Sequence, residues 1–522
     1  MPSSPAKTWS TLFCALILAT GCASGVPQNT LFQPISDGGA PFVHVWNTET
    51  HPFPGAAVID ADGDGRFEVF VGGGHGQGDL LLRYDGEKLV NIIDDTELSS
   101  TTATYGARAI DMDQDGDTDL VVARNDGVFI YLNQSQDGAI TFRKRFVPVS
   151  LQSNAVPFDV AVGDINNDGA PDLYVSAFVA FPAFKSATFN DPDHAKTNRM
   201  LENNGDLTFT DVTELTGTAS KNNSFFSVFI DLDMDGWQDL VVAQNTGEVE
   251  IFRNLKGITF QDVPTHSGYG FWMGLGIGDV DNDGDQDLFF PNVGTSIAEF
   301  LTRGDIRKDQ RHTHDWLLLE NQGNFQFKEA TDQWIPKGEG FAWGSVFEDV
   351  NLDGHLDLFV AQNYLKWPPH KWFRLEGRAY LQRDEEEAPR FVPAPQLGLA
   401  NKYFGQSPLI VDLNDDGRQD FLWINMDGPL KGFINRSEAP FVTVRLPDNL
   451  KHLDTRITLI TDKGRTYTKQ VTCGAGYMTD QTPDISFGLP QGARALKLLI
   501  QNPDGTSRTI YNPPVNTRIT LP

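Results

Sequence analysis

Cysteine is nearly absent from this chain. Only three cysteines occur in 522 residues, and two of them, Cys14 and Cys22, lie close to the N-terminus. A disulfide framework is excluded, because Cys473 is then left without a partner. Nothing near Cys473 in the sequence supplies an activating base, so we expect a small buried residue rather than a nucleophile.

Basic residues are also scarce. The chain has 41 Lys and Arg against 70 Asp and Glu, which gives a formal charge of −29. This charge would repel a polyanion, which argues against nucleic-acid binding. Many of the excess acids lie in seven short repeated loops, where bound divalent cations would offset nearly half of the charge. The acidity is therefore mostly a signature of metal sites.

Recognisable catalytic motifs are missing. No Gly-x-Ser-x-Gly elbow occurs. The stretch GGGHGQG, residues 72–78, follows an expected strand but opens no helix, which argues against a phosphate cradle. Carboxylate pairs are common, but the repeated loops account for most of them, so they are poor evidence for acid/base catalysis. We therefore assign no catalytic residue.

The sequence has no long apolar run, but one short apolar run lies near its start. Residues 11–20 (TLFCALILAT) follow Lys7 and are too few to span a membrane as a mature helix. The pattern Ala-Thr-Gly-Cys ending at Cys22 resembles a bacterial lipoprotein signal box, in which the cysteine is lipidated. We predict a signal peptide over 1–21, a linker over 22–30 and lipidation at Cys22, the alternative being a plain cleaved signal. Ala23 follows Cys22 instead of Asp, so the resemblance implies export to the outer membrane of a Gram-negative bacterium.

What the sequence has in abundance is a nine-residue acidic loop, represented by DMDQDGDTD at residues 111–119. Its acids recur at positions one, three and five and can point at one centre. The glycine at position six allows a sharp reversal, and the carboxylate at position nine can close the cage. Calcium takes six to eight oxygens at roughly 2.3–2.6 Å and tolerates irregular geometry, so calcium is the predicted cofactor.

Seven copies of this loop occur, each with glycine at position six. The predicted metal ligands at positions one, three, five and nine are Asp60, Asp62, Asp64 and Glu68; Asp111, Asp113, Asp115 and Asp119; Asp164, Asn166, Asp168 and Asp172; Asp231, Asp233, Asp235 and Asp239; Asp279, Asp281, Asp283 and Asp287; Asp349, Asn351, Asp353 and Asp357; Asp412, Asn414, Asp416 and Asp420. The first, second, fourth and fifth copies carry four carboxylates each. We expect these four to bind calcium more tightly than the three copies with Asn.

Each loop is followed by a short apolar run and then by a hairpin with Asn and Gly turn chemistry, which indicates four strands per repeat. Loop starts are 48 to 70 residues apart. Seven such repeats predict an all-β fold, a seven-bladed β-propeller over 31–437. The seventh repeat lacks an outer strand, and we predict that LFQPIS at residues 31–36 supplies it and closes the ring. Period-two alternation predicts a small C-terminal β-domain over 438–522.

These features support a resemblance to known families. The loops and hairpins resemble FG-GAP or VCBS repeats, the units of integrin α-subunit propellers. From Val442 onward the chain resembles the ASPIC/UnbV domain of the cartilage-acidic-protein family, chiefly in Gly474, Gly476, Tyr477, residues 487–489 and the PDG turn at 503–505. The two resemblances imply the same architecture over nearly the whole mature chain.

Three repeats carry insertions, at 177–197, 292–315 and 363–378, between their second and third strands and hence on the face opposite the loops. Cations and aromatic rings gather in two of these insertions. The candidate ligand face consists of Arg303, Arg307, Lys308, Arg311, Trp367, Lys371, Trp372 and Arg374. It could bind an anionic ligand such as an acidic glycan, or its charges could be solvated loop tips whose aromatics pack onto the ring.

His312, His314 and Asp315 could offer ligands to zinc. Side chains two residues apart face the same way only on a strand, however, and the pattern supplies no third histidine. The zinc hypothesis is therefore weak at the level of sequence.

The leading interpretation is an exported, lipid-anchored, calcium-binding monomer that binds a glycan or protein at the cell surface without catalysis. One alternative is a polysaccharide-acting enzyme, a lyase or hydrolase, that uses the insertion face. Another is a purely structural scaffold.

Overall fold

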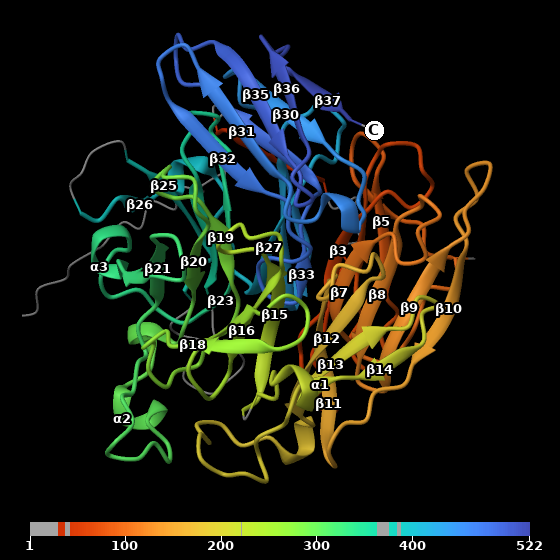
Figure 1. Cartoon of the computed structure of the whole chain (residues 1–522), viewed down its shortest axis with the longest axis vertical. Coiled ribbons are helices and arrows are strands. Elements are labelled where there is room, and N and C mark those ends of the chain that lie inside the picture. The colour runs from red at the N-terminus through yellow and green to blue at the C-terminus, as the bar shows by residue number, and fades with distance from the viewer. Residues whose placement is uncertain are drawn as a thin grey trace, which may run out of the picture. The chain divides into compact units, whose positions relative to one another are not determined.

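The computed structural model describes residues 30–36, 42–94, 96–220, 222–362, 375–383 and 388–521, and Leu31–Pro522 forms one compact unit. Most of this unit consists of antiparallel four-stranded sheets, one per repeat (Figure 1). The strands of the first six sheets are β3 (Ala56–Ile59), β4 (Glu68–Val71), β5 (Leu80–Tyr84) and β6 (Leu89–Asn91); β7 (Thr104–Ile110), β8 (Asp119–Arg124), β9 (Gly127–Asn133) and β10 (Phe142–Val147); β11 (Ala155–Gly163), β12 (Asp172–Val179), β13 (Arg199–Asn203) and β14 (Phe209–Asp211); β15 (Ser224–Ile230), β16 (Asp239–Gln244), β17 (Glu250–Asn254) and β18 (Phe260–Val263); β19 (Gly276–Gly278), β20 (Asp287–Phe290), β21 (Leu317–Asn321) and β22 (Phe327–Glu329); β23 (Ala342–Glu348), β24 (Asp357–Gln362), β25 (Arg378–Gln382) and β26 (Phe391–Pro393).

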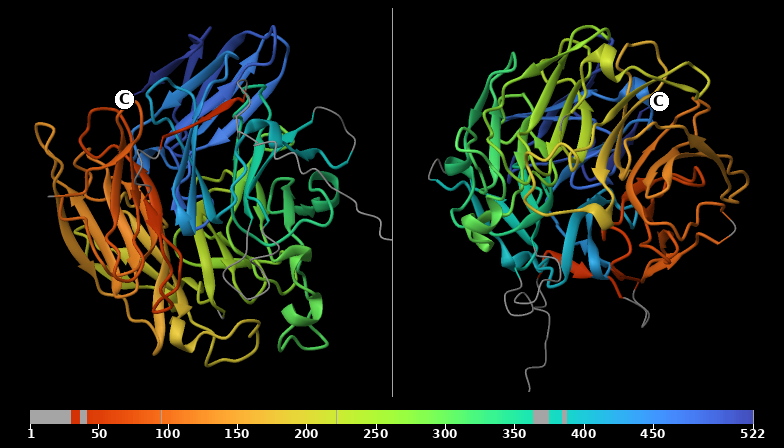
Figure 2. Two further views of the ribbon diagram at one scale, coloured as in Figure 1. Left: turned by 180° about the vertical axis from the view of Figure 1, so that it is seen from behind. Right: turned by 90° about the horizontal axis from the view of Figure 1, so that it is seen from below.

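The sheets are the blades of the predicted all-β propeller. In each blade the first strand ends just before the acidic loop and the second begins at its ninth residue, as in β7 and β8. First strands of successive blades contact one another, for example β7 with β11 and β11 with β15, so they line the centre of the ring (Figure 2). Among them, β7 and β15 are buried along their whole length, because neighbouring blades cover both of their faces.

The ring is closed by the N-terminal segment. The seventh blade has β27 (Phe404–Val411), β28 (Asp420–Pro429) and β29 (Lys431–Asn435), and its outer strand is β1 (Phe32–Pro34), which pairs with β29. Phe32 is fully buried and lies edge-on to Phe421. The pairing confirms the predicted closure. A further short strand, β2 (Val43–His44), extends β28 on its other side.

Residues beyond the seventh blade form two small sheets. One contains β30 (Phe441–Arg445), β34 (Asp484–Gly488) and β37 (Thr517–Thr520), and the other contains β31 (Arg456–Thr461), β32 (Thr466–Gln470), β35 (Ala495–Gln501) and β36 (Ser507–Tyr511). Val442, Leu459 and Leu498 are fully buried between them. The same apolar cluster includes Val121 and Val160 of the second and third blades, so the core of this C-terminal β-domain is continuous with that of the propeller.

One segment of this domain, residues 473–481, leaves its sheets and enters the ring. Its strand β33 (Thr479–Asp480) pairs in parallel with β3, and Gly476 exchanges two backbone hydrogen bonds of 2.8 Å with Leu275. Tyr477 is fully buried, with its ring centroid 5.3 Å from those of Phe53 and Phe225. We call residues 473–481 the plug. The sequence gives no sign of it, because its partners lie in several blades.

Cys473 begins the plug and is 3% exposed, which confirms the expected buried residue. Burial raises the pKa of its thiol well above the ordinary value, so the thiolate is disfavoured.

Helices are single turns within the described ranges: α1 (Thr213–Thr216), α2 (Glu299–Thr302) and α3 (Thr331–Trp334), with 3₁₀ turns at Phe181–Ala183, Gly294–Ser296, Pro395–Leu397 and Leu450–His452. None of the helices in these ranges has the length and apolar character needed to cross a bilayer.

Replacing Tyr477 by Ala should lower the free energy of unfolding by about 3–5 kcal/mol, because it removes a fully buried ring and leaves a cavity. The matched control is Tyr511→Ala in the same domain, since Tyr511 is 71% exposed and should change stability by no more than about 0.5 kcal/mol. Urea unfolding in saturating calcium measures both variants. Equal losses in the two would contradict the assigned packing.

Candidate metal centres

Each acidic loop is curled by two residues with left-handed backbone. In the loop between β7 and β8 these are Gln114, with φ 63°, and Gly116, with φ 99°. The other six loops repeat the pattern at positions four and six, and the sixth residue is always glycine. The glycine reversal was predicted. The left-handed fourth residue was not, although Gly63 in the first loop is a local signal for it.

The first-position aspartate is oriented by the backbone. In all seven loops the amide of the sixth-position glycine donates to Oδ2 of the first aspartate, at 2.7–3.1 Å. This leaves Oδ1 directed at the loop centre. Oδ1 of Asp60, Asp111 and Asp279 is buried and has no hydrogen-bond partner among the described residues, and the same holds for Oδ1 of Asp233. An orphaned carboxylate oxygen is costly unless a cation meets it.

These orphaned oxygens occur in the loops whose carboxylates converge. Four groups have ligand atoms within 4.8 Å of one another: Asp60, Asp62 and Glu68; Asp111, Asp113 and Asp115; Asp231, Asp233 and Asp239; Asp279, Asp281 and Asp287. They belong to the four loops with four carboxylates. The chemistry of these oxygens fits a hard cation such as calcium, whose charge would neutralise the converging acids.

The three loops with Asn at position three are different. In each of them Nδ2 of the Asn donates to the fifth-position aspartate at 2.9–3.1 Å. The amide of that aspartate in turn donates to Oδ1 of the first aspartate at 3.0–3.1 Å. The structure describes all residues of these loops, and no three of their carboxylates converge within 4.8 Å. The loops are therefore not equivalent.

The ninth-position carboxylate is the most deeply buried of the predicted ligands. Burial raises the pKa of Asp119 to about 7, of Asp172 to about 8 and of Asp239 to about 9. Backbone amides donate to these groups and lower the pKa in part, and neighbouring acids raise it further. Without a cation, several of these carboxyl groups would hold a proton at neutral pH.

The backbone amides that donate to the ninth-position carboxylate do not all come from the acidic loop. Some come from the same position in successive repeats, at the end of the third strand. The backbone N–H of Asn254, at the end of the third strand of its blade, donates to Oδ1 of Asp239 at 2.9 Å, and its side chain donates to the carbonyl of Ile165 in the preceding loop. The same side-chain link to the preceding loop is made by Asn133, Asn321, Gln382 and Asn435 at 2.9–3.2 Å. These residues join successive acidic loops, whereas the sequence predicts only that such residues form hairpin turns.

Two of the converging loops also contain a guanidinium. Arg83 donates to Asp62 at 2.6 Å and to Glu68 at 2.7 Å, and Arg253 donates to Asp233 at 2.6 Å. Each arginine comes from the third strand of the blade. Neither arginine is evident from the sequence, because a cation that pairs with predicted metal ligands gives no periodic signal.

The C-terminal domain covers much of the loop face. Six of the seven loops are contacted, in chain order by Arg445, the carbonyl of Asp448, Asp454, Arg456, Gly488 and Arg518. In the fourth loop, for example, the amide of Asp231 donates to Oδ1 of Asp454 at 2.9 Å. The loops therefore form an interface between the two parts of the chain.

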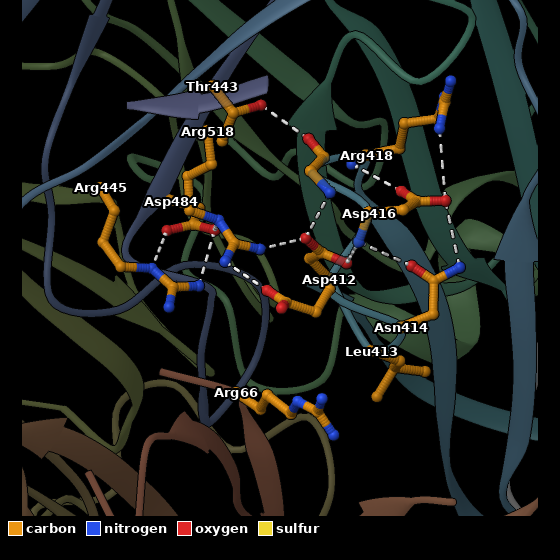
Figure 3. A network of polar contacts seen from close by, with 12 residues as sticks. Arg66, Asp412, Leu413, Asn414, Asp416, Arg418, Thr443, Arg445, Asp484 and Arg518 are labelled. Atoms are coloured by element: carbon orange, nitrogen blue, oxygen red, sulfur yellow. Dashed lines mark hydrogen bonds and ion pairs between the residues drawn. The ribbon is translucent and has the colours of Figure 1, made fainter. Parts of the chain in front are cut away.

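The seventh loop shows this interface in detail (Figure 3). Arg518 pairs with Asp412 and Asp415 of the loop and with Asp484 of its own domain. Asp484 also accepts two hydrogen bonds from Arg445 at 2.6 and 2.9 Å. Thus the acidic loop is one half of an ion-pair network that joins the propeller to the C-terminal domain.

On the opposite face, the insertions at 177–197 and 292–315 pack against each other. Asp305 accepts hydrogen bonds from the amides of Phe189 and Asn190 at 2.5 and 3.1 Å. Phe189 and Ile306 are buried in an apolar cluster that also contains Tyr477. The two insertions therefore cover the plug from this side.

The predicted ligand face is described only in part. Arg303, Arg307, Lys308 and Arg311 are exposed. Arg307 lies 3.5 Å from Asp309 and Arg311 lies 3.7 Å from Glu329, so acids interleave with the cations. Trp367, Lys371, Trp372 and Arg374 lie outside the described residues, as does Cys22.

Two family models support the repeats and the C-terminal domain. An FG-GAP-like repeat model matches residues 60–122, 111–175 and 231–290, and an ASPIC and UnbV model matches residues 446–522. Cartilage acidic protein 1 from Xenopus tropicalis is 22% identical over 488 residues, which span 86% of this chain and 70% of that protein. The Homo sapiens protein is 23% identical over 502 residues, spanning 89% and 71%. A solved Agrocybe aegerita lectin that recognises non-reducing terminal N-acetylglucosamine is 16% identical, with a TM-score of 0.40, covering 74% of this chain and 90% of that chain.

Asp113→Asn should reduce the calcium bound per chain, because it removes a converging carboxylate from the second loop. Asp117→Asn is the matched control, since position seven offers its main-chain carbonyl and the Asp117 side chain is exposed. Flow dialysis measures the bound calcium, and thermal unfolding with and without chelator measures its contribution to stability. A melting temperature that does not change in excess chelator would refute the stabilising role of calcium.

The metal-free protein should become less stable as pH rises from 5 to 8. Folding raises the pKa of Asp119 to about 7 and of Asp239 to about 9, above the ordinary value of about 4. Between these values the folded state holds protons that the unfolded state has released, so stability falls with rising pH. Saturating calcium should reverse or flatten this slope. Melting curves at each pH, with calcium or with chelator, test this sign, and a metal-free protein that gains stability towards pH 8 would contradict it.

Proposed function

Because the chain combines FG-GAP-like repeats with an ASPIC and UnbV domain, and resembles cartilage acidic protein 1 over most of its length, we propose that it is an exported calcium-binding module that binds a glycan or protein at the cell surface. Cys22 would carry the lipid that anchors it to the outer membrane. The module itself would act by binding and not by catalysis.

The observation that carries this proposal is the coverage of the acidic loops. Six of them contact the C-terminal domain, and Asp231 is bound to Asp454 across that interface. A metal ion buried beneath a second domain is poorly placed to meet an external ligand. Calcium would instead fasten the blades and hold the two parts of the chain as one rigid body.

The opposite face is then the surface left for a partner. The insertions at 177–197 and 292–315 lie there, and they differ between repeats while the loops repeat one pattern. Arg307 and Arg311 are exposed there, each close to an acid. Alternating charges of this kind suit a polar partner, either a protein surface or a glycan with acidic and neutral groups.

A rigid scaffold makes this surface effective. Binding is weakened when loops must be ordered first, and the insertions are held in advance by Asp305 and by the apolar cluster around Tyr477. Calcium should therefore act on affinity indirectly, through the stability of the blades.

The test is retention of acidic and neutral glycans and of outer-membrane proteins on the immobilised chain in calcium. Arg307→Ala combined with Arg311→Ala should weaken binding of the retained partner by about tenfold or more, whereas Arg494→Ala, an exposed arginine of the C-terminal domain, should not.

The same incubations should be examined for new reducing ends and unsaturated uronates. Product that disappears in the Arg307 and Arg311 variants would replace the binding function with a polysaccharide-acting enzyme. Absence of any retained partner would favour a structural scaffold.

A further inference from the structure

A cavity of roughly 600 Å³ lies beside the insertion of the fifth blade, away from the acidic loops. Its lining includes His312 and His314, from the end of the insertion, and Glu299, from α2 near its start. Imidazole and carboxylate groups together at a cavity wall are the ligand types of zinc and related transition metals.

His312 is the strongest indication of a ligand. Its side chain is 1% exposed, and neither ring nitrogen has a hydrogen-bond partner among the described residues. A buried imidazole needs a partner for at least its acceptor and its donor, and leaving both unmet is costly. Phe189 packs edge-on near the ring, at a centroid distance of 6.3 Å, so the ring is held in place.

The backbone brings the two histidines to the same side. Residues 311–313 run parallel to Tyr269, whose amide donates to the carbonyl of Arg311 and whose carbonyl accepts from Thr313, both at 2.8 Å. On this extended segment the rings of His312 and His314 stack with centroids 5.9 Å apart. Two imidazoles bound to one tetrahedral ion, with metal–nitrogen distances of about 2.0–2.1 Å, place their centroids roughly 5 Å apart. The ligand atoms of His312, His314 and Glu299, all described residues, do not lie within 4.8 Å of one another, so His314, which is 26% exposed, has to turn towards His312 when an ion binds.

The third ligand is a carboxylate, because the sequence pattern around His312 and His314 supplies no third histidine. Oε1 of Glu299 lies 3.7 Å from Nδ1 of His312, and the Glu299 side chain is 57% exposed, so it can move onto a shared ion. Asp315 lies 3.9 Å from Nε2 of His314 and can orient that ring. The three ligands lie within one insertion, so no movement of blades is required.

We propose that His312, His314 and Glu299 form a binding site for a divalent transition-metal ion of the zinc type, with a fourth position open to the cavity. The site is chemically distinct from the acidic loops, because calcium prefers oxygen ligands whereas imidazole selects zinc-like ions. An open fourth position takes water or a donor atom from a partner. This site would bind its ion whether or not the acidic loops bind calcium.

The experiment is isothermal titration of the full chain with zinc in saturating calcium, which keeps the acidic loops filled. We expect one zinc ion per chain. His314→Ala and Glu299→Gln should each weaken zinc binding by more than about tenfold without changing the melting temperature in calcium, since both side chains are partly exposed. His75→Ala, an exposed histidine of the first blade, is the matched control and should bind zinc normally.

Cobalt provides a second readout. Cobalt in the wild-type chain should show the visible absorption of a low-coordinate site with nitrogen ligands, and His312→Ala should lose it. If His312→Ala fails to fold, the His314 and Glu299 variants decide the question. The absence of zinc binding by the folded chain, or zinc binding that survives both of those variants, would overturn the proposal.

Discussion

A carboxylate buried at the start of the second strand is the constraint on which the rest of this structure depends. Asp239 is an example: it is the first residue of β16 and is 1% exposed. It accepts two backbone hydrogen bonds, yet its burial still raises its pKa to about 9. Such a group needs a proton or a cation. The left-handed turns, the converging carboxylates and the asparagine clamps are all arranged around this need.

The same requirement joins the two parts of the chain. The C-terminal domain supplies Arg518 to the acids of the seventh loop and Asp454 to the amide of Asp231, so it helps to satisfy polar groups that the blades alone leave exposed. The plug of this domain supplies apolar contacts inside the ring, because Tyr477 fills the space between Phe53, Phe225 and Trp343. Polar contacts at the loop face and apolar contacts in the ring thus hold one unit together.

This arrangement changes the meaning of the acidic loops. Seen singly, the loop at 111–119 looks like a ligand site, but seven copies, six of which contact a second domain, are better understood as parts of the scaffold. Distinctive chemistry lies instead where the repeats differ. The insertion at 292–315 carries exposed arginines close to acids, and it also holds His312, whose ring nitrogens lack partners among the described residues.

The sequence by itself determined the seven blades, their strand order, the closure of the ring by residues 31–36 and the positions of the acidic loops, because these follow from local periodicity and from one repeated turn. It also identified the four loops with four carboxylates as the expected tighter calcium sites, since charge count is a local property, and in the structure these are the loops whose carboxylates converge. Only the tertiary structure decided that Asn254 clamps two loops, that Arg518 pairs with Asp412, that Tyr477 lies inside the ring and that Glu299 approaches His312. Asp231 and Asp454 are 223 residues apart, and contacts of that kind depend on how blades and domain meet in space. A local sequence pattern cannot predict such contacts, because the residues around one partner carry no information about the other partner.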